Sequence, residues 1–221
     1  MKIVVLGSTG MLGSAVCHYM VEKYGSKNVY LSYRDESVSY GSKKFYFDAA
    51  SMMDGLDKGS IEFTDCDYII NCIGVIKPFM NKNPKESILI NSIFPMILSD
   101  YCKKRGSRLF QITTDCCYSG KTGCYIETSP HDALDDYGKS KSLGENIDAM
   151  VIRTSIIGEE IHKDASLISW VKSQKGKTVN GYLNHLWNAI TTKQYAKNLS
   201  KIIDNDWYSS ALYHVISNTI S

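Results

Sequence analysis

Short apolar runs alternate with amphipathic stretches along most of the chain, which predicts a parallel sheet wrapped by helices. Strands are expected over residues 2–6, 28–33, 43–48, 67–72, 108–113, 150–153 and 212–215. Helices are expected over residues 11–24, 51–57, 84–105, 134–149, 166–174 and 192–204. Pro95 should kink the longest of these helices or mark a boundary within it. The pattern therefore predicts an α/β fold with a doubly wound parallel sheet of about seven strands.

The alternation weakens from about Gly158, and the segment up to Thr192 has short elements rich in polar and aromatic residues. We therefore expect a nucleotide-binding unit over residues 1–157 and a small substrate lobe over 158–221, interleaved with the last strand and helix. The chain stops shortly after the last expected strand, so this lobe is expected to be either minimal or truncated.

The composition adds few constraints. The 221 residues are 43% hydrophobic and 22% charged with a net charge of +2, which fits a globular protein and favours neither nucleic acid nor a membrane surface as a partner. The seven cysteines form no C-x-x-C pair and no zinc spacing, so reduced thiols in a cytoplasmic protein are expected. No run approaches the roughly 20 apolar residues of a membrane span, and none resembles a signal peptide.

A glycine-rich loop, Gly7-Ser8-Thr9-Gly10-Met11-Leu12-Gly13, joins the first expected strand to the first expected helix. Glycines permit a tight turn there, and the backbone amides at a helix N-terminus can bind a pyrophosphate. The spacing is G-x-x-G-x-x-G rather than the usual G-x-G-x-x-G of dinucleotide-binding proteins. A turn without a ligand is the alternative, but the position directly after a buried strand favours a dinucleotide site.

Residues after the next three strands would complete a cofactor site. Arg34 follows the second strand, where a guanidinium would attract a 2′-phosphate, so NADPH is expected. The neighbouring Asp35 keeps NADH open, and a solvated surface arginine is the alternative for Arg34. Asp48 and Ala49 follow the third strand, where the carboxylate could bind the adenine amino group. The run 71–74 would pass beside the nicotinamide ribose, with a glycine at its end allowing close approach.

Tyr137 and Lys141 lie four residues apart on an expected helix and therefore share one face. A neighbouring ammonium favours the phenolate and lowers its pKa from roughly 10, which suits a group that protonates a carbonyl. This pair accordingly points to a reductase.

Two other pairs have the same spacing. Tyr19/Lys23 lies in the first helix and is interpreted as packing with a solvated end, whereas Tyr40/Lys44 lies in a Ser/Gly-rich stretch with no helix to align it. The pair Tyr137/Lys141 is preferred over these two because of Thr114. This threonine ends the fifth strand at the carboxyl edge of the sheet, where ligands bind in such folds. A threonine in a strand is usually structural, but combined with the glycine loop it can orient a substrate carbonyl.

These motifs together resemble the dTDP-4-dehydrorhamnose reductase family, in the extended branch of the short-chain dehydrogenase/reductase superfamily. The matching residues are Gly7 through Gly13, Thr113-Thr114-Asp115, Gly120, Tyr125-x-Glu127, Pro130, Tyr137-Gly138-Lys139-Ser140-Lys141, Gly144-Glu145 and Arg153-Thr154-Ser155. The resemblance implies a Rossmann-type fold with a small substrate lobe and NADPH or NADH as hydride donor. It also implies a nucleotide-linked 4-keto-6-deoxysugar as substrate, in deoxysugar or surface-polysaccharide biosynthesis.

The residue pattern and the resemblance together assign the site. The expected catalytic residues are Thr114, Tyr137 and Lys141. The expected cofactor-binding residues are Gly7, Thr9, Gly10, Met11, Leu12, Gly13, Arg34, Asp48, Ala49, Asn71, Cys72, Ile73, Gly74, Thr113, Tyr137 and Lys141. The expected substrate-binding residues are Thr114, Asp115, Cys116, Tyr137, Trp187 and Asn188. Reductases of the family can use Mg²⁺ at an interface, but no carboxylate cluster in this sequence predicts a metal.

Two departures from the family pattern concern the substrate. Cys116 stands where related dehydratases carry the glutamate that serves in elimination, which argues against dehydration. Ile156-Ile157 replaces an aromatic residue that would shape the sugar pocket, so the sugar can differ from the rhamnose precursor. Trp187 and Asn188 could bind a base or sugar, and a loop with a buried tryptophan is an equal alternative.

Two other functions stay open. An epimerase of the same superfamily would retain its cofactor without net consumption. A second relative, the regulatory subunit of methionine adenosyltransferase, keeps the fold and the dinucleotide site but acts through a partner, as fold alone does not fix function. The sequence leaves the oligomeric state open, with a homodimer as one candidate.

Overall fold

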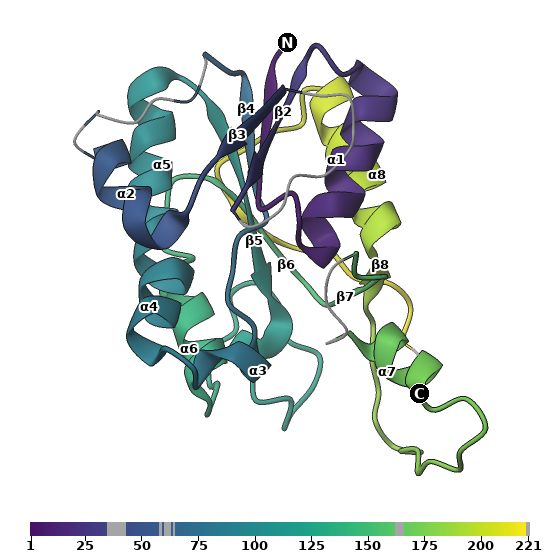
Figure 1. Ribbon diagram of the computed structural model, residues 1–221. Helices are drawn as coiled ribbons and strands as arrows, with labels where there is room; N and C mark the ends of the chain where they lie inside the picture. Colours follow the sequence, from purple (N-terminus) through teal and green to yellow (C-terminus); the bar gives the residue numbers. More distant parts are fainter. Residues whose placement is uncertain (35–42, 58, 60–62, 64, 162–165, 220–221) are drawn as a thin grey trace.

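The computed structural model of the protein describes residues 1–34, 43–57, 59, 63, 65–161 and 166–219. Its centre is a seven-stranded, fully parallel sheet in the order β3-β2-β1-β4-β5-β6-β9 (Figure 1). The strands are β1 (Ile3–Leu6), β2 (Val29–Tyr33), β3 (Lys43–Tyr46), β4 (Tyr68–Asn71), β5 (Arg108–Thr114), β6 (Met150–Thr154) and β9 (Leu212–His214). All seven expected strands are confirmed, each within two residues at either end.

Helices cover both faces of this sheet (Figure 1). The α-helices are α1 (Met11–Tyr24), α2 (Ala49–Asp57), α3 (Lys77–Met80), α4 (Pro84–Ile88), α5 (Phe94–Arg105), α6 (Asp136–Leu143), α7 (Leu167–Ser173) and α8 (Thr192–Asp204). Two apolar clusters form the core: one joins α1 and α8 to the sheet, and the other joins α2 and α5 to its opposite face. In β1, Val5 packs into the first cluster and Val4 into the second, so the buried strand separates two hydrophobic layers. The doubly wound fold is confirmed.

The strand order reverses direction at β1. This strand pairs with β2 on one side and with β4 on the other, and the chain leaves it through α1 to cover one face. The crossover from β3 to β4 runs through α2 on the opposite face (Figure 1). Open parallel sheets bind ligands outside the carboxyl ends of the strands at such a reversal. The fold therefore places a crevice directly after Leu6 and Asn71.

The long helix expected over residues 84–105 is interrupted before Pro95. It consists of α4, a π-helical turn at Leu89–Ile93, and α5, in which Pro95 occupies the first turn. Proline lacks the N–H that would bond the carbonyl of Asn91 and clashes with that carbonyl in a regular helix. The π turn accommodates this, as such turns inside helices often do. The expected boundary at Pro95 is confirmed.

The helix expected over residues 134–149 is shorter than predicted. Asp135 has an extended backbone and caps α6 by accepting a hydrogen bond from Gly138 N at 2.8 Å. At the other end, Gly144 lies against the π turn, where a Cβ would be only 2.2 Å from the Asn91 carbonyl oxygen. The chain turns away at this contact, and the prediction of helix to residue 149 is wrong because tertiary packing ends α6 early.

Two further features were not predicted. The short helix α3 follows the fourth strand, and a two-stranded parallel pair forms between β7 (Ile156–Ile157) and β8 (Ile190–Thr191). All seven cysteines are free thiols, as the sequence predicted. Among the described residues, no helix is both long and apolar enough to cross a bilayer. The division of the chain at residue 157 stays a prediction.

Candidate active site

The glycine loop is built for close approach of backbone to ligand. Gly7 has a φ of +78°, and a Cβ there would lie about 3 Å from Ile73 and Cys72 of the neighbouring turn. A Cβ on Gly13 would lie 2.0 Å from the Gly7 carbonyl oxygen, so α1 can pack against the loop only with glycine at this position. Gly10 caps α1 without any side-chain hydrogen bond, which leaves the amides of the first turn open to an anion.

The loop is fixed to the end of β2 by two serines. Gly7 N donates to Ser32 Oγ at 2.8 Å, and Ser8 Oγ donates to the Ser32 carbonyl at 2.5 Å. Both serine side chains are buried. These bonds hold the amides of the loop in one geometry, which a site for a diphosphate requires.

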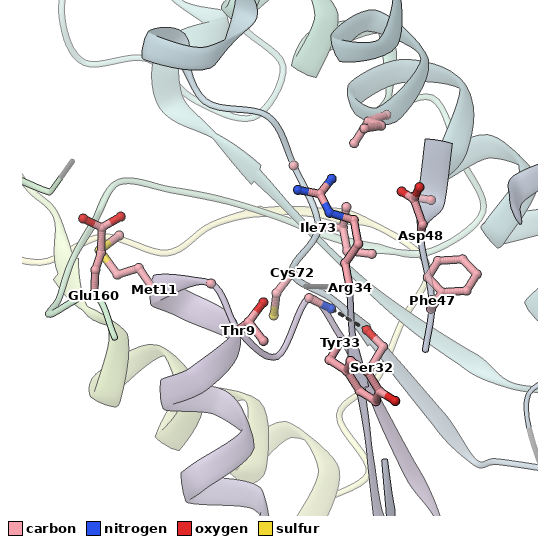
Figure 2. Close-up of a pocket in the computed structure, with 15 residues that line it drawn as sticks. Thr9, Met11, Ser32, Tyr33, Arg34, Phe47, Asp48, Cys72, Ile73 and Glu160 are labelled. Carbon is pink, nitrogen blue, oxygen red and sulfur yellow. Dashed lines mark hydrogen bonds between the residues drawn. The ribbon is translucent and has the colours of Figure 1, made fainter. Parts of the chain in front are cut away.

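A cavity of about 350 Å³ opens beside this loop (Figure 2). Among its lining residues are the expected cofactor residues Gly7, Thr9, Gly10, Met11, Arg34, Asp48, Ala49, Cys72, Ile73 and Gly74. Figure 2 shows the Arg34 guanidinium and the Asp48 carboxylate at the same end of the cavity, away from Met11. The Asp48 carboxylate also accepts hydrogen bonds from Ala50 N at 3.2 Å and Ser51 Oγ at 3.0 Å, at the start of α2.

A second cavity of about 380 Å³ continues along the carboxyl edge of the sheet. It shares Gly10, Met11, Cys72, Ile73, Gly74 and Glu160 with the first cavity. It is also lined by the expected residues Leu12, Thr113, Thr114, Asp115, Cys116, Tyr137 and Lys141. The glycine loop and the Thr114–Tyr137–Lys141 set therefore face one extended site, as the sequence predicted from motifs more than 100 residues apart.

Thr114 and Tyr137 interact at the carboxyl end of β5. Both side chains line the second cavity, and the Thr114 side chain is close enough to lower the pKa of Tyr137. Thr114 Oγ1 in turn accepts from Cys116 N at 3.1 Å and lies 3.3 Å from Asp115 Oδ1. Gly138 brings the start of α6 against this turn, since a Cβ there would be 2.1 Å from the Cys116 carbonyl oxygen. This backbone contact brings the start of α6, and with it Tyr137, against the turn that carries Thr114.

Lys141 lies deeper in the site and is only 7% exposed. Its Nζ donates to the Ile112 carbonyl at 3.2 Å and would be 3.4 Å from a Cβ on Gly74. Burial lowers the pKa of Lys141 to about 8, against a smaller opposite effect of Glu145. The lysine is therefore protonated at neutral pH and loses its charge in mildly basic solution.

The expected lowering of the Tyr137 pKa is not found. Burial raises the pKa of Tyr137 well above its usual value, the charge of Cys116 raises it further, and the Thr114 hydrogen bond opposes them. The expectation was wrong because desolvation of the phenol dominates its pKa, and Lys141 donates its hydrogen bond to the Ile112 carbonyl. The phenol therefore holds its proton at neutral pH.

Four expected site residues do not line either cavity. Gly13 acts through packing, and the buried Asn71 donates to Gln111 Oε1 at 2.8 Å and accepts from Ile73 N at 3.1 Å. Trp187 donates through Nε1 to Ser155 Oγ at 2.8 Å, and it is Ser155 that lines the second cavity. Asn188 contributes its carbonyl to Ser217 N at 2.8 Å. Asn71 therefore orients the turn after β4, and Trp187 supports the wall of the site through Ser155, whereas the contact of Asn188 with Ser217 lies outside both cavities.

One buried polar atom in the second cavity has no partner. The Oγ1 atom of Thr113, a residue that is 5% exposed, makes no hydrogen bond within the described structure. Buried hydroxyl groups are nearly always paired, so an unpaired one in the wall of a cavity indicates a place for a ligand or a water.

Three residues of the site were missed at the sequence level. Asn91, on the π turn, accepts from Val75 N at 2.9 Å and donates to Val75 O at 2.9 Å and to Ser140 Oγ at 3.1 Å. Lys77, on α3, pairs with Asp135 at 2.7 Å. Glu160 lines both cavities and accepts from Ser166 N at 2.6 Å (Figure 2). The position of Asn91, four residues before Pro95, is a local sequence signal that could have pointed to it. Lys77 and Glu160 have no such signal in the sequence.

A buried ion pair lies behind the site. Arg153 binds Glu145 through Nε at 3.0 and 3.1 Å and through Nη2 at 2.7 Å, and both side chains are almost fully buried. Within the described residues, ligand atoms of Cys117, His131 and Glu145 lie within 4.8 Å of one another, as a metal site would require. Arg153 bonds both His131 and Glu145, so the cation at this cluster is the guanidinium itself.

Comparison with known proteins places the chain in a family. Residues 1–219 match the family model of the RmlD substrate binding domain. The chain belongs to this family. The spore coat polysaccharide biosynthesis protein SpsK of Bacillus subtilis is 25% identical over 223 residues, covering 100% of this chain and 70% of that protein. The methionine adenosyltransferase 2 subunit beta of Xenopus tropicalis is 25% identical over 170 residues, covering 73% of this chain and 48% of that protein.

Solved structures agree with the fold of this RmlD-family chain. A hypothetical dTDP-4-dehydrorhamnose reductase from Sulfolobus tokodaii superposes with a TM-score of 0.80 at 22% identity, covering 100% of this chain and 78% of that one. The dTDP-4-dehydrorhamnose reductase of Bacillus anthracis, solved with NADP, superposes with a TM-score of 0.75 at 18% identity. The match covers 100% of this chain and 77% of that one. A monomeric L-threonine 3-dehydrogenase from a metagenome superposes with a TM-score of 0.79 at 17% identity. This match covers 100% of this chain and 78% of that one. The resemblance to the reductase family seen in the sequence is confirmed, and the chain carries the fold of nicotinamide-dependent dehydrogenases.

Proposed function

We propose that the protein is an NADPH-dependent oxidoreductase that reduces the 4-keto group of a nucleotide-linked 6-deoxysugar. The observation that carries the proposal is that Thr114 and Tyr137 line the same cavity at the carboxyl edge of β5, in a site continuous with the glycine loop. Membership of the RmlD family supports the substrate class, and the similarity to a spore coat polysaccharide protein supports a role in surface-polysaccharide synthesis.

The residues present fit a nicotinamide dinucleotide. The open amides at the start of α1 would hold the pyrophosphate, and Arg34 would bind a 2′-phosphate on the adenosine ribose. Lys141 and the unpaired Thr113 hydroxyl would face the nicotinamide end, since both line the second cavity. The bound cofactor would supply the hydride for reduction. The NADP held by the B. anthracis reductase is consistent with this assignment.

The side chains of the chain supply the remaining chemistry. Thr114 Oγ1 and the Tyr137 hydroxyl together would bind the carbonyl oxygen, which orients the ketone and polarises it. Tyr137 then donates its proton to that oxygen as negative charge develops. Its raised pKa keeps the proton on the phenol until reaction, and the protonated Lys141 lies on the next turn of α6 to stabilise the phenolate left behind.

The direct test replaces Tyr137 by Phe, which removes the acid but retains the ring. We expect the variant still to bind NADPH in a fluorescence titration and to lose about 10²–10⁴-fold in turnover with a panel of nucleotide 4-ketosugars. Full turnover in this variant would refute the assignment of Tyr137 as the acid.

The same substrate panel separates the two alternatives. An epimerase would convert a nucleotide sugar without net change in nicotinamide absorbance. A regulatory subunit, suggested by the similarity to methionine adenosyltransferase 2 subunit beta, would bind NADPH and turn over no ketosugar at all. Stoichiometric oxidation of NADPH with one member of the panel distinguishes the reductase from both.

A further inference from the structure

Lys77 places a second cation beside the Thr114–Tyr137 pair. Its Nζ lies 2.7 Å from Asp135 Oδ2 and 5.9 Å from the centre of the Tyr137 ring. Lys77 begins α3, and three residues around it, Val75, Ile76 and Phe79, line the second cavity. Lys77 itself lines neither cavity, but its ammonium group lies beside Tyr137, next to the part of the site where the reacting carbonyl would bind.

The charge of Lys77 acts on the substrate end of the site rather than on the cofactor end. Besides Asp135, the ionisable groups whose charges act on Lys77 are those of Cys116 and Asp115. Both residues line the second cavity. Lys141, by contrast, is buried and donates to the Ile112 carbonyl. Lys141 is thus buried inside the site, whereas Lys77 is exposed to solvent beside it.

Lys77 could leave Asp135 for another anion with only a small loss of free energy. The side chains of Lys77 and Asp135 are 54% and 50% exposed, and ion pairs this exposed contribute about 0–1 kcal/mol. Asp135 would not be left without a partner, because it also accepts the Gly138 amide at 2.8 Å as the cap of α6. The hydrogen bond from Lys77 to Asp135 is the main cause that raises the pKa of Lys77. The lysine is therefore cationic throughout the neutral range.

We propose that Lys77 is a specificity-determining residue that leaves Asp135 to bind a phosphate of the nucleotide-linked substrate. This inference rests on the proposed function, because it requires a nucleotide-linked sugar in the second cavity. It explains why a lysine with an exposed, exchangeable partner lies against the ring of the general acid.

The test measures binding to the NADP-saturated protein by calorimetry, with dTDP-glucose, UDP-glucose and UDP-glucuronate as probes. The variants are Lys77→Met, Lys77→Arg and, as a matched control, Lys85→Met, which removes an exposed lysine of α4 outside both cavities. We expect Lys77→Met to weaken binding by about 10- to 100-fold, as for loss of a charged hydrogen bond, with Lys77→Arg retaining most of the affinity. The control should match the wild type.

The three probes share a diphosphate, and only UDP-glucuronate adds a carboxylate. Equal losses on all three are expected for a phosphate partner, and a loss confined to UDP-glucuronate would overturn the assignment to the phosphate. If Lys77→Met binds every probe as tightly as the wild type, the inference is overturned while the proposed function stands. If the wild type binds NADP but none of the probes, the proposed substrate class fails and the inference fails with it. Unchanged NADP affinity in Lys77→Met shows that the variant is folded.

Discussion

Replacing Lys141 by Met should make the protein more stable at neutral pH while removing its activity. Lys141 is 7% exposed, and its burial lowers the pKa from 10.5 to about 8. A buried base with a lowered pKa destabilises the folded state wherever it must carry its charge. Below pH 8 the side chain is protonated in both folded and unfolded chains, so the full cost of burying the charge applies there.

The magnitude follows from the shift in pKa. A lowering from 10.5 to about 8 corresponds to about 3 kcal/mol, at about 1.4 kcal/mol for each unit. Methionine has a similar length and buries without a charge. The loss of the Lys141 hydrogen bond does not leave the Ile112 carbonyl unpaired, because Gln111 Nε2 also donates to it at 3.1 Å. We therefore expect Lys141→Met to be more stable than the wild type by about 1–3 kcal/mol at pH 7.

The assay is urea unfolding of both proteins, without cofactor, at pH 7 and pH 10. As the pH rises from 8 to 10.5 the folded protein releases the proton before the unfolded chain does, so the advantage of methionine should shrink over that interval. Lys139→Met, which removes an exposed lysine from the same helix, serves as the control and should show no such dependence. A Lys141→Met protein that is less stable at pH 7, or whose advantage is the same at both pH values, would refute the reasoning.

Three further predictions concern the cofactor site, the glycine loop and the buried ion pair. Arg34→Ala should weaken NADPH binding by about 10- to 100-fold and leave NADH binding unchanged, as measured by fluorescence titration; an unchanged preference would remove Arg34 from cofactor selection. Gly13→Ala should abolish cofactor binding or folding, because its Cβ would lie 2.0 Å from a loop carbonyl, whereas Gly181→Ala, with nothing within 4 Å, should be neutral in thermal unfolding. Glu145→Ala should cost about 3–5 kcal/mol in urea unfolding, since it leaves the buried Arg153 without its carboxylate, and a loss below about 1 kcal/mol would contradict this.

The sheet and the glycine loop could be predicted because their signals are local. A buried parallel strand needs a short apolar run, and a turn with positive φ at Gly7 needs glycine, so both leave a mark on the adjacent sequence. The site at the carboxyl edge followed from the parallel order of these strands. Tyr137 and Lys141 could be paired because their spacing on a helix is fixed by the helix itself.

Other parts of the site could not be predicted, because they depend on contacts between distant segments. α6 ends at Leu143 because Gly144 meets the π turn, and that contact joins residues more than 50 positions apart. Lys77 approaches Tyr137 only because α3 packs beside α6 after the fourth strand. The protonation of Tyr137 was misjudged for the same reason, since burial is a property of the packed structure rather than of the spacing of two residues.

The sequence by itself therefore determined the doubly wound fold, the dinucleotide loop, and the three residues Thr114, Tyr137 and Lys141. Periodicity, turn chemistry and helix spacing are short-range properties, and the chain carries them explicitly. The tertiary structure alone decided how those residues are charged, which side chains support them, and that Lys77 lies beside Tyr137. Burial and the proximity of distant segments exist only once the sheet and its helices have packed together.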